Sequence, residues 1–204
     1  MEPIIHPLFP TPIYFTNLKR SFSLKELKEV EIHKKKLSQN TGNYNTLNSY
    51  ILNGKTFIPL KKELELHIKD YFNRIYSPED DKITPYITQS WLNYTDKNQY
   101  HHIHEHPNSL VSGVLYINAD EKYDKIKFHD KQYNCFKITP KDYNMYNSNS
   151  WWFPVKKTDL VLFPSSTTHS VENKEGDNTR VSLAFNVFVK GILGETKELT
   201  ELIL

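Results

Sequence analysis

Four of the nine histidines in this 204-residue chain fall within six residues, at positions 101, 102, 104 and 106. A proline follows directly and stops strand pairing, so we expect these side chains at the exit of a strand. Side chains alternate between the faces of a strand, which predicts His102, His104 and His106 on one face and His101 and Glu105 on the other. Neutral imidazoles at this spacing can reach one ion, and imidazole suits iron, zinc, copper or nickel. The pattern predicts a metal site.

His169 is the candidate for a ligand from a distant part of the chain. It follows the apolar run 160–163 and a turn that contains Pro164. A histidine from a second strand would complete a set of three ligands and leave the other positions of the metal open. For an isolated histidine at this place, capping of the turn is the alternative.

Arg180 begins a second apolar run, residues 180–186. A buried guanidinium without a partner is costly, so this residue requires an anion. Its planar fork suits a carboxylate, and Ser182 lies on the same face of the strand and can add a hydroxyl. An internal salt bridge with one of the 24 acidic residues is the alternative to a carboxylate ligand.

Composition narrows the class of protein. A chain of 204 residues with 38% hydrophobic and 13% aromatic residues can bury the core of one domain. The net charge of +2 is weak evidence against duplex nucleic acid or an anionic membrane as partner. The single cysteine, Cys135, excludes an intramolecular disulfide. With no signal peptide and no apolar span, the chain is predicted to be cytoplasmic.

The elements that must position these residues are two helices followed by short strands. A capping box at Ser23 and Glu26 predicts a helix to about Leu37, and apolar residues at helical spacing predict another over 57–76. Strands are predicted over 13–15, 87–94, 111–118, 126–129, 136–138, 160–163 and 181–189. Residues 38–50 read as a loop, and the aromatic segment 139–154 as a lid, a substrate wall or ordinary loop packing. This order indicates an α+β or mostly β antiparallel sandwich.

The motifs also occur in a characteristic order. They are residues 104–109 (His-Glu-His-Pro-Asn-Ser), 112–116 (Ser-Gly-Val-Leu-Tyr), 159–165 (Asp-Leu-Val-Leu-Phe-Pro-Ser), 169–171 (His-Ser-Val) and 180–186 (Arg-Val-Ser-Leu-Ala-Phe-Asn). Residues 89–93 (Gln-Ser-Trp-Leu-Asn) and 8–13 (Leu-Phe-Pro-Thr-Pro-Ile) add to the pattern. In this order the chain resembles the 2-oxoglutarate/Fe(II)-dependent dioxygenase family of bacteria and tailed phages, most strongly over 89–186.

The resemblance implies a double-stranded β-helix (a jelly roll) with a core over 83–190 and a mainly helical flank over 1–80, within a single domain 1–204. It implies that His104, His106 and His169 hold Fe(II), with His106 in a place that is usually acidic. It implies that Arg180, with Ser182 and Tyr116, binds 2-oxoglutarate. By strand alternation alone, His102 with His104 stays an equally allowed ligand pair, whereas Glu105 faces away.

The function implied by the resemblance is hydroxylation with O2 and 2-oxoglutarate, releasing succinate and CO2, in the cytosol of a bacterium or a phage-infected host. The substrate stays open among a small molecule, a protein side chain and a nucleobase, and a homodimer stays an open alternative. Two other functions remain: a three-histidine iron or zinc cupin-type enzyme without 2-oxoglutarate, and a non-catalytic jelly roll that acts in binding or in a virion. Arg180 followed by Ser182 favours the 2-oxoglutarate reading.

Overall fold

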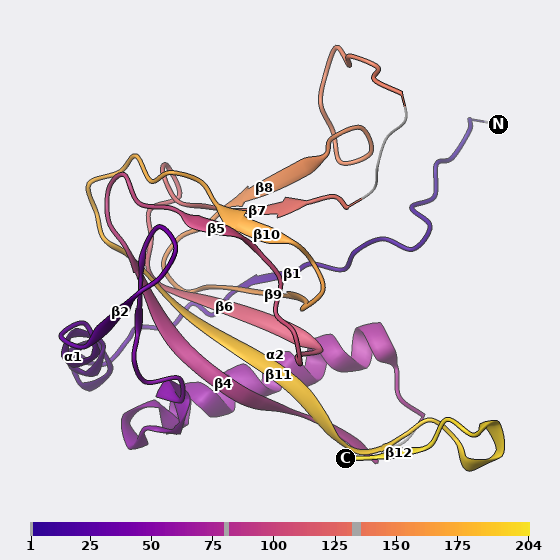
Figure 1. Cartoon of the computed structure of the whole chain (residues 1–204), viewed down its shortest axis with the longest axis horizontal. Helices are drawn as coiled ribbons and strands as arrows, with labels where there is room; N and C mark the ends of the chain where they lie inside the picture. Colours follow the sequence, from indigo (N-terminus) through magenta and orange to yellow (C-terminus); the bar gives the residue numbers. More distant parts are fainter. Residues whose placement is uncertain (1, 80–81, 132–135) are drawn as a thin grey trace.

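Two antiparallel sheets stacked face to face form the centre of the structure, and helices cover the outer face of the larger sheet (Figure 1). This computed structural model describes residues 2–79, 82–131 and 136–204. The elements are β1 (Tyr14–Asn17), α1 (Leu24–His33), β2 (Leu37–Gln39), β3 (Tyr44–Thr46), α2 (Ile58–Tyr76), β4 (Ile83–Thr95), β5 (His101–His104), β6 (Val111–Asn118), β7 (Lys125–His129), β8 (Ser150–Pro154), β9 (Asp159–Pro164), β10 (His169–Val171), β11 (Arg180–Leu193) and β12 (Leu202–Ile203), with short 3-10 turns at 51–53, 55–57 and 196–198.

The large sheet has the strand order β1-β9-β6-β11-β4-β3-β2, with β12 paired to β11, and the small sheet has the order β5-β10-β7-β8. The pairings between these strands are antiparallel. The architecture confirms the predicted mostly β sandwich with helices at its N-terminal side.

Alternating side chains of the large sheet build two separate cores. On the outer face, buried residues such as Leu115 and Leu183 pack with Leu60, Leu64 and other apolar residues of α2. On the inner face, a second cluster joins the two sheets, and its members are Tyr116, Ile126, Phe128, Val155, Val161 and Phe163. The second core holds the small sheet, and with it the histidine stretch, against the large sheet.

Both predicted helices are present. The capping box at Ser23 and Glu26 forms as expected, but α1 ends at His33, because the chain turns after it and Leu37 begins β2. The apolar stripe predicted for α2 is buried against the large sheet. No helix among the described residues is both long enough and apolar enough to cross a bilayer.

Several predicted boundaries were wrong. Residues 136–138 form no strand, and Phe136 and Ile138 are each 85% exposed, so apolar type alone misled the assignment. The predicted loop 38–50 contains the β2–β3 hairpin, whose strands are only three residues long and carry polar residues. β8 and β10 were also not predicted, because their pairing depends on distant partners. Cys135 lies outside the described residues.

Candidate active site

The small sheet brings the two histidine-bearing segments together. β10 pairs with β5, and in this register His169 lies opposite His104. β5 ends at His104, so His106 lies in the following turn and not on the strand as expected. There its backbone N–H donates to the carbonyl of Ser165 at 3.1 Å, which ties this turn to the end of β9. His106 thus comes to lie beside His104 through the conformation of a turn and not, as expected, through the alternation of side chains along a strand.

His104, His106 and His169 converge on one point. One ring nitrogen from each lies within 4.8 Å of the others. The ring centroids are 5.0 Å apart for His104 and His106, 4.2 Å for His104 and His169, and 5.2 Å for His106 and His169. Three imidazoles from two strands and a turn can therefore surround one ion.

Each of these rings is oriented by an oxygen atom that contacts its Nδ1. His104 Nδ1 lies 2.8 Å from the carbonyl of His102, and His169 Nδ1 lies 3.0 Å from the carbonyl of Thr167. His106 Nδ1 lies 2.6 Å from Oδ1 of Asn186. Because these oxygens accept hydrogen bonds, each Nδ1 carries the proton and each Nε2 keeps its lone pair.

This arrangement leaves the Nε2 atoms as the ring nitrogens that could bind a metal. His106 Nε2 is buried and has no hydrogen-bond partner among the described residues. An unpaired buried nitrogen with a lone pair is costly unless something binds it. The donor set of three oriented neutral imidazoles fits a divalent first-row transition ion.

Burial keeps the histidines neutral. Mainly through burial, the pKa of His104 is lowered to about 4 and that of His169 to about 3. Burial also lowers the pKa of His106, although the hydrogen bond with Asn186 acts in the opposite direction. Near pH 7 all three rings are therefore neutral, so a metal ion need not displace a proton from Nε2.

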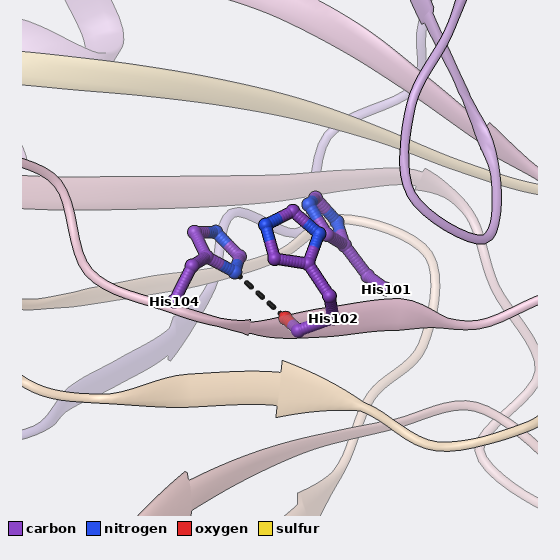
Figure 2. Close-up of side chains that lie close together, drawn as sticks. All are labelled: His101, His102 and His104. Carbon is purple, nitrogen blue, oxygen red and sulfur yellow. Dashed lines mark hydrogen bonds between the residues drawn. The ribbon is translucent and has the colours of Figure 1, made fainter.

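His101 corrects the prediction from strand alternation. It was expected on the face opposite His104, but the two rings are stacked with centroids 4.5 Å apart and planes 16° apart. The reason is a bulge: His169 pairs with His104 and Val171 with His101, so three steps along β5 match two along β10. The extra residue turns His101 to the side of His104. His101, His102 and His104 thereby form a second convergent group (Figure 2).

Glu105 takes no part in either group of histidines. Its carboxylate accepts a hydrogen bond from Oγ1 of Thr168 at 2.6 Å and pairs with Nζ of Lys131 at 2.8 Å. The sequence predicted that this side chain faces away from His104. Neither histidine group therefore includes a carboxylate from the described part of the chain.

Arg180 lies at the first position of β11, is 2% exposed, and has a guanidinium that is only half satisfied. Its Nη2 donates to Oγ1 of Thr95 at 3.0 Å, whereas the buried Nη1 has no hydrogen-bond partner in the described part of the chain. No ion pair joins Arg180 to a described acidic residue, so the alternative of an internal salt bridge finds no support. Burial lowers the pKa of Arg180, and the nearby carboxylate of Asp124 opposes this.

Tyr116 and Ser182 are neighbours across the β6–β11 pairing, and both are buried. Together with Arg180 and Asn93, whose amide oxygen has no hydrogen-bond partner among the described residues, they line a narrow cavity of about 40 Å³. His104, His106 and His169 line the same cavity. The guanidinium and the three imidazoles thus face one space.

A wider, open pocket of about 640 Å³ lies on the other side of the histidines. His101, His102, His104 and His106 line it, together with residues of β3, β4 and the β2–β3 hairpin. The aromatic segment 139–154 contributes to neither space; its residues line a separate pocket of about 1310 Å³. In this structure the segment is not a wall of the histidine pocket.

Three supporting residues received no role from the sequence. Asn186 binds His106, Trp91 stacks on the His106 ring with centroids 5.6 Å apart, and Thr95 binds Arg180. Trp91 and Asn186 do lie in the motifs 89–93 and 180–186, which was the available signal. Their tasks depend on contacts between β4, β11 and the turn after β5, which no local pattern encodes.

Comparisons with known proteins give a family and a fold. Residues 89–186 match the model of a family described as "Putative 2OG-Fe(II) oxygenase". A search of curated proteins gave no match.

Solved structures share the fold. A 2OG-Fe(II) oxygenase family oxidoreductase from Burkholderia pseudomallei has a TM-score of 0.58 at 12% identity, covering 86% of this chain and 84% of that one. HygX from Streptomyces hygroscopicus, with nickel and 2-oxoglutarate bound, has a TM-score of 0.55 at 10% identity, covering 87% and 82%. A prolyl-4-hydroxylase from Pseudomonas putida has a TM-score of 0.54 at 12% identity, covering 86% and 92%.

At such low identities the solved structures establish the double-stranded β-helix fold and no more. The family match adds the sequence pattern, and it covers β5, β6, β9 and β10 together with the histidines and Arg180. Residues 89–186, which carry the histidines and Arg180, therefore match the "Putative 2OG-Fe(II) oxygenase" family in sequence, and the whole chain shares the fold of solved 2OG oxygenases.

Proposed function

We propose that this chain is an Fe(II)- and 2-oxoglutarate-dependent dioxygenase that hydroxylates a substrate entering through the open pocket. The observation that carries the proposal is Arg180: it is buried, its Nη1 has no described hydrogen-bond partner, and it lines the same cavity as three histidines whose Nδ1 atoms are engaged in hydrogen bonds, which leaves each Nε2 to bind a metal. A dicarboxylate that binds metal at one end and arginine at the other would satisfy both ends of this cavity. 2-Oxoglutarate has this form.

In the proposed site, Nε2 of His104, His106 and His169 hold the iron. Their Nδ1 contacts hold the rings in the orientation that binding requires, so little ordering is left to the moment of binding. Bound iron with 2-oxoglutarate supplies the activation of O2: one oxygen atom enters the substrate C–H bond as hydroxyl, and the other enters succinate as CO2 leaves.

Arg180 binds the distal carboxylate in this proposal. Thr95 holds Nη2, which leaves Nη1 directed to the ligand, and the hydroxyls of Tyr116 and Ser182 can add hydrogen bonds. Burial raises the pKa of Tyr116, so its hydroxyl keeps the proton that it would donate. Loss of this arginine should therefore affect the co-substrate more than the metal.

The three-histidine set gives the proposed site an electrostatic property of its own. Neutral imidazoles leave the full double charge of the ion uncompensated, whereas a ligating carboxylate would remove part of it. A dianionic co-substrate is then attracted both by the ion and by Arg180. Neutral ligands do not indicate which substrate the site accepts, and the substrate stays open among small molecules, protein side chains and nucleobases.

The test is an anaerobic titration of Fe(II)-loaded protein with 2-oxoglutarate, followed by the visible metal-to-ligand charge-transfer band. The band should saturate in the wild type and require much more 2-oxoglutarate in Arg180→Met, which keeps the length of the side chain. Arg74→Met removes an exposed arginine that pairs with Asp70 and serves as the matched control. Thermal unfolding of each variant checks that it is folded.

Each other outcome points to a different function. Fe(II) binding without a band would refute the 2-oxoglutarate assignment and favour a three-histidine enzyme that needs no co-substrate. Absence of Fe(II) binding would refute an oxygenase and favour a non-catalytic binding protein. An equal band in Arg180→Met and wild type would show that the distal carboxylate binds elsewhere.

A further inference from the structure

The histidine stretch contains more imidazoles than one metal site uses. His101 and His102 lie beside His104, and the ring centroids are 5.2 Å apart for His101 and His102 and 4.8 Å for His102 and His104 (Figure 2). One ring nitrogen from each of the three lies within 4.8 Å of the others. The bulge in β5 creates this group, because it turns His101 to the side of His104.

His102 has a ring nitrogen that is available to bind an ion. Its Nδ1 is buried and, among the residues that the structure describes, lacks a hydrogen-bond partner. The other described buried side-chain atoms in this state include His106 Nε2 and Arg180 Nη1, which face the proposed iron and co-substrate. An imidazole nitrogen of this kind, next to two further imidazoles, is a favourable place for an ion.

His104 belongs to both histidine groups but can serve only one at a time. Its Nδ1 donates to the carbonyl of His102, so only Nε2 can bind metal. The group with His106 and His169 also takes one ring nitrogen of His104, and because Nδ1 is engaged, this must again be Nε2. An ion held by His101 and His102 would therefore remove a ligand from the proposed iron site.

His101 is the most constrained member of the group. Its Nε2 accepts a hydrogen bond from the side-chain amide of Asn40, at 3.1 Å, and its ring is stacked parallel to that of His104. Metal binding in the plane of the His101 ring thus requires a ring rotation and loss of the Asn40 contact. Asn40 acts as a competitor that keeps His101 from the ion.

We propose that His101, His102 and His104 form a second site for a late first-row divalent ion, Zn²⁺ in particular, whose occupation excludes iron from His104. As far as the structure describes the chain, the group offers imidazoles and no carboxylate, because Glu105 is held by Thr168 and Lys131. It therefore selects zinc, nickel or copper over magnesium or calcium. Zinc binds nitrogen sites more tightly than Fe(II). The second site is thus an inhibitory metal site, and the inhibition, but not the binding itself, rests on the proposed function.

The test isolates the second site by removing the first. In the double variant His106→Ala/His169→Ala, Co²⁺ serves as a visible probe, and Zn²⁺ is added to displace it. We expect one equivalent of Co²⁺ to bind, with affinity falling at least about tenfold when His102→Ala is added. Unchanged affinity on adding His102→Ala, or no saturable binding in the double variant, overturns the proposal.

Two further variants examine the competition by Asn40. Asn40→Ala in the same background should tighten Co²⁺ binding, because His101 no longer gives up a hydrogen bond. Asn45→Ala is the matched control, since this amide lines the same open pocket and has no described hydrogen bond to a histidine. Weaker binding in Asn40→Ala would mean that Asn40 supports His101 instead of competing with it.

The wild type tests exclusion separately. It should bind one equivalent of Zn²⁺ in total, whereas two equivalents would show that the sites are independent and overturn the inhibitory role. The result for the double variant does not depend on iron or 2-oxoglutarate. Co²⁺ binding by the double variant can therefore be observed even if 2-oxoglutarate gives no charge-transfer band, and the band can be observed even if the double variant does not bind Co²⁺.

Discussion

Asn186 is expected to control the metal affinity of a site that it does not itself bind. Its Oδ1 accepts the Nδ1–H of His106 at 2.6 Å, which leaves Nε2 of that ring directed to the ion. In Asn186→Ala the Nδ1–H loses its acceptor in a largely buried position, and the alternative tautomer places the proton on the metal-binding nitrogen. The stacked Trp91 still holds the plane of the ring, at 5.6 Å between centroids, but not its tautomer.

The magnitude follows from this contact. Loss of an acceptor behind a ligating histidine typically weakens metal binding about 10–100-fold, which corresponds to about 1.4–2.7 kcal/mol. Asn186→Asp keeps an acceptor at the same position and makes it anionic, so it should bind at least as tightly as the wild type. Asn45 lines the open histidine pocket but has no described hydrogen bond to His106, so Asn45→Ala should leave the metal affinity unchanged.

The assay is isothermal titration of metal-free protein with Co²⁺ or Fe(II) under anaerobic conditions, with thermal unfolding to verify folding. To isolate the site under discussion, all variants are made in a His102→Ala background. Affinity in Asn186→Ala within about twofold of the wild type would refute the reasoning. So would tighter binding in Asn186→Ala than in Asn186→Asp, because the hydrogen bond would then oppose metal binding.

Three further results are expected. Burial lowers the pKa of His104 to about 4 and of His169 to about 3 in the folded protein, so as pH falls these histidines are protonated in the unfolded chain before they are protonated in the folded one. The metal-free protein should therefore lose stability as pH falls from about 6.5 toward 4. A constant melting temperature over that range would contradict this. Lys174→Met removes the cation whose Nζ lies 3.5 Å from the fully buried carboxylate of Asp124, so urea unfolding should show a free energy of unfolding lower by about 3–5 kcal/mol. A decrease below about 1 kcal/mol would contradict this expectation. Gly113→Ala would place a Cβ 2.1 Å from the ring of Phe185 on the neighbouring strand, and should cost about 1–3 kcal/mol or more by the same measurement, so wild-type stability would show that the strands can separate locally.

Local patterns in the chain were enough to suggest a chemistry and to predict most of the elements. The capping box and the apolar stripe of α2 depend on neighbours within a few turns, so they could be identified from spacing. The buried strands β6, β9 and β11 contain apolar, β-branched or aromatic stretches, which are also visible in the local sequence. The residue types at positions 104, 106, 169 and 180 limited the possible chemistry before any fold was known.

Only the tertiary structure decided how these residues meet. The register of β10 against β5 sets His169 opposite His104, and the bulge in that pairing turns His101 to the same side. Contacts between distant segments supply the partners Asn186 for His106 and Thr95 for Arg180, and they leave Nη1 of that arginine without a hydrogen-bond partner among the described residues. Strand register, bulges and unpaired buried atoms are set by the packing of the whole chain, because pairing energies between distant segments compete with one another. A periodic pattern within one segment does not show which of these pairings is the more stable.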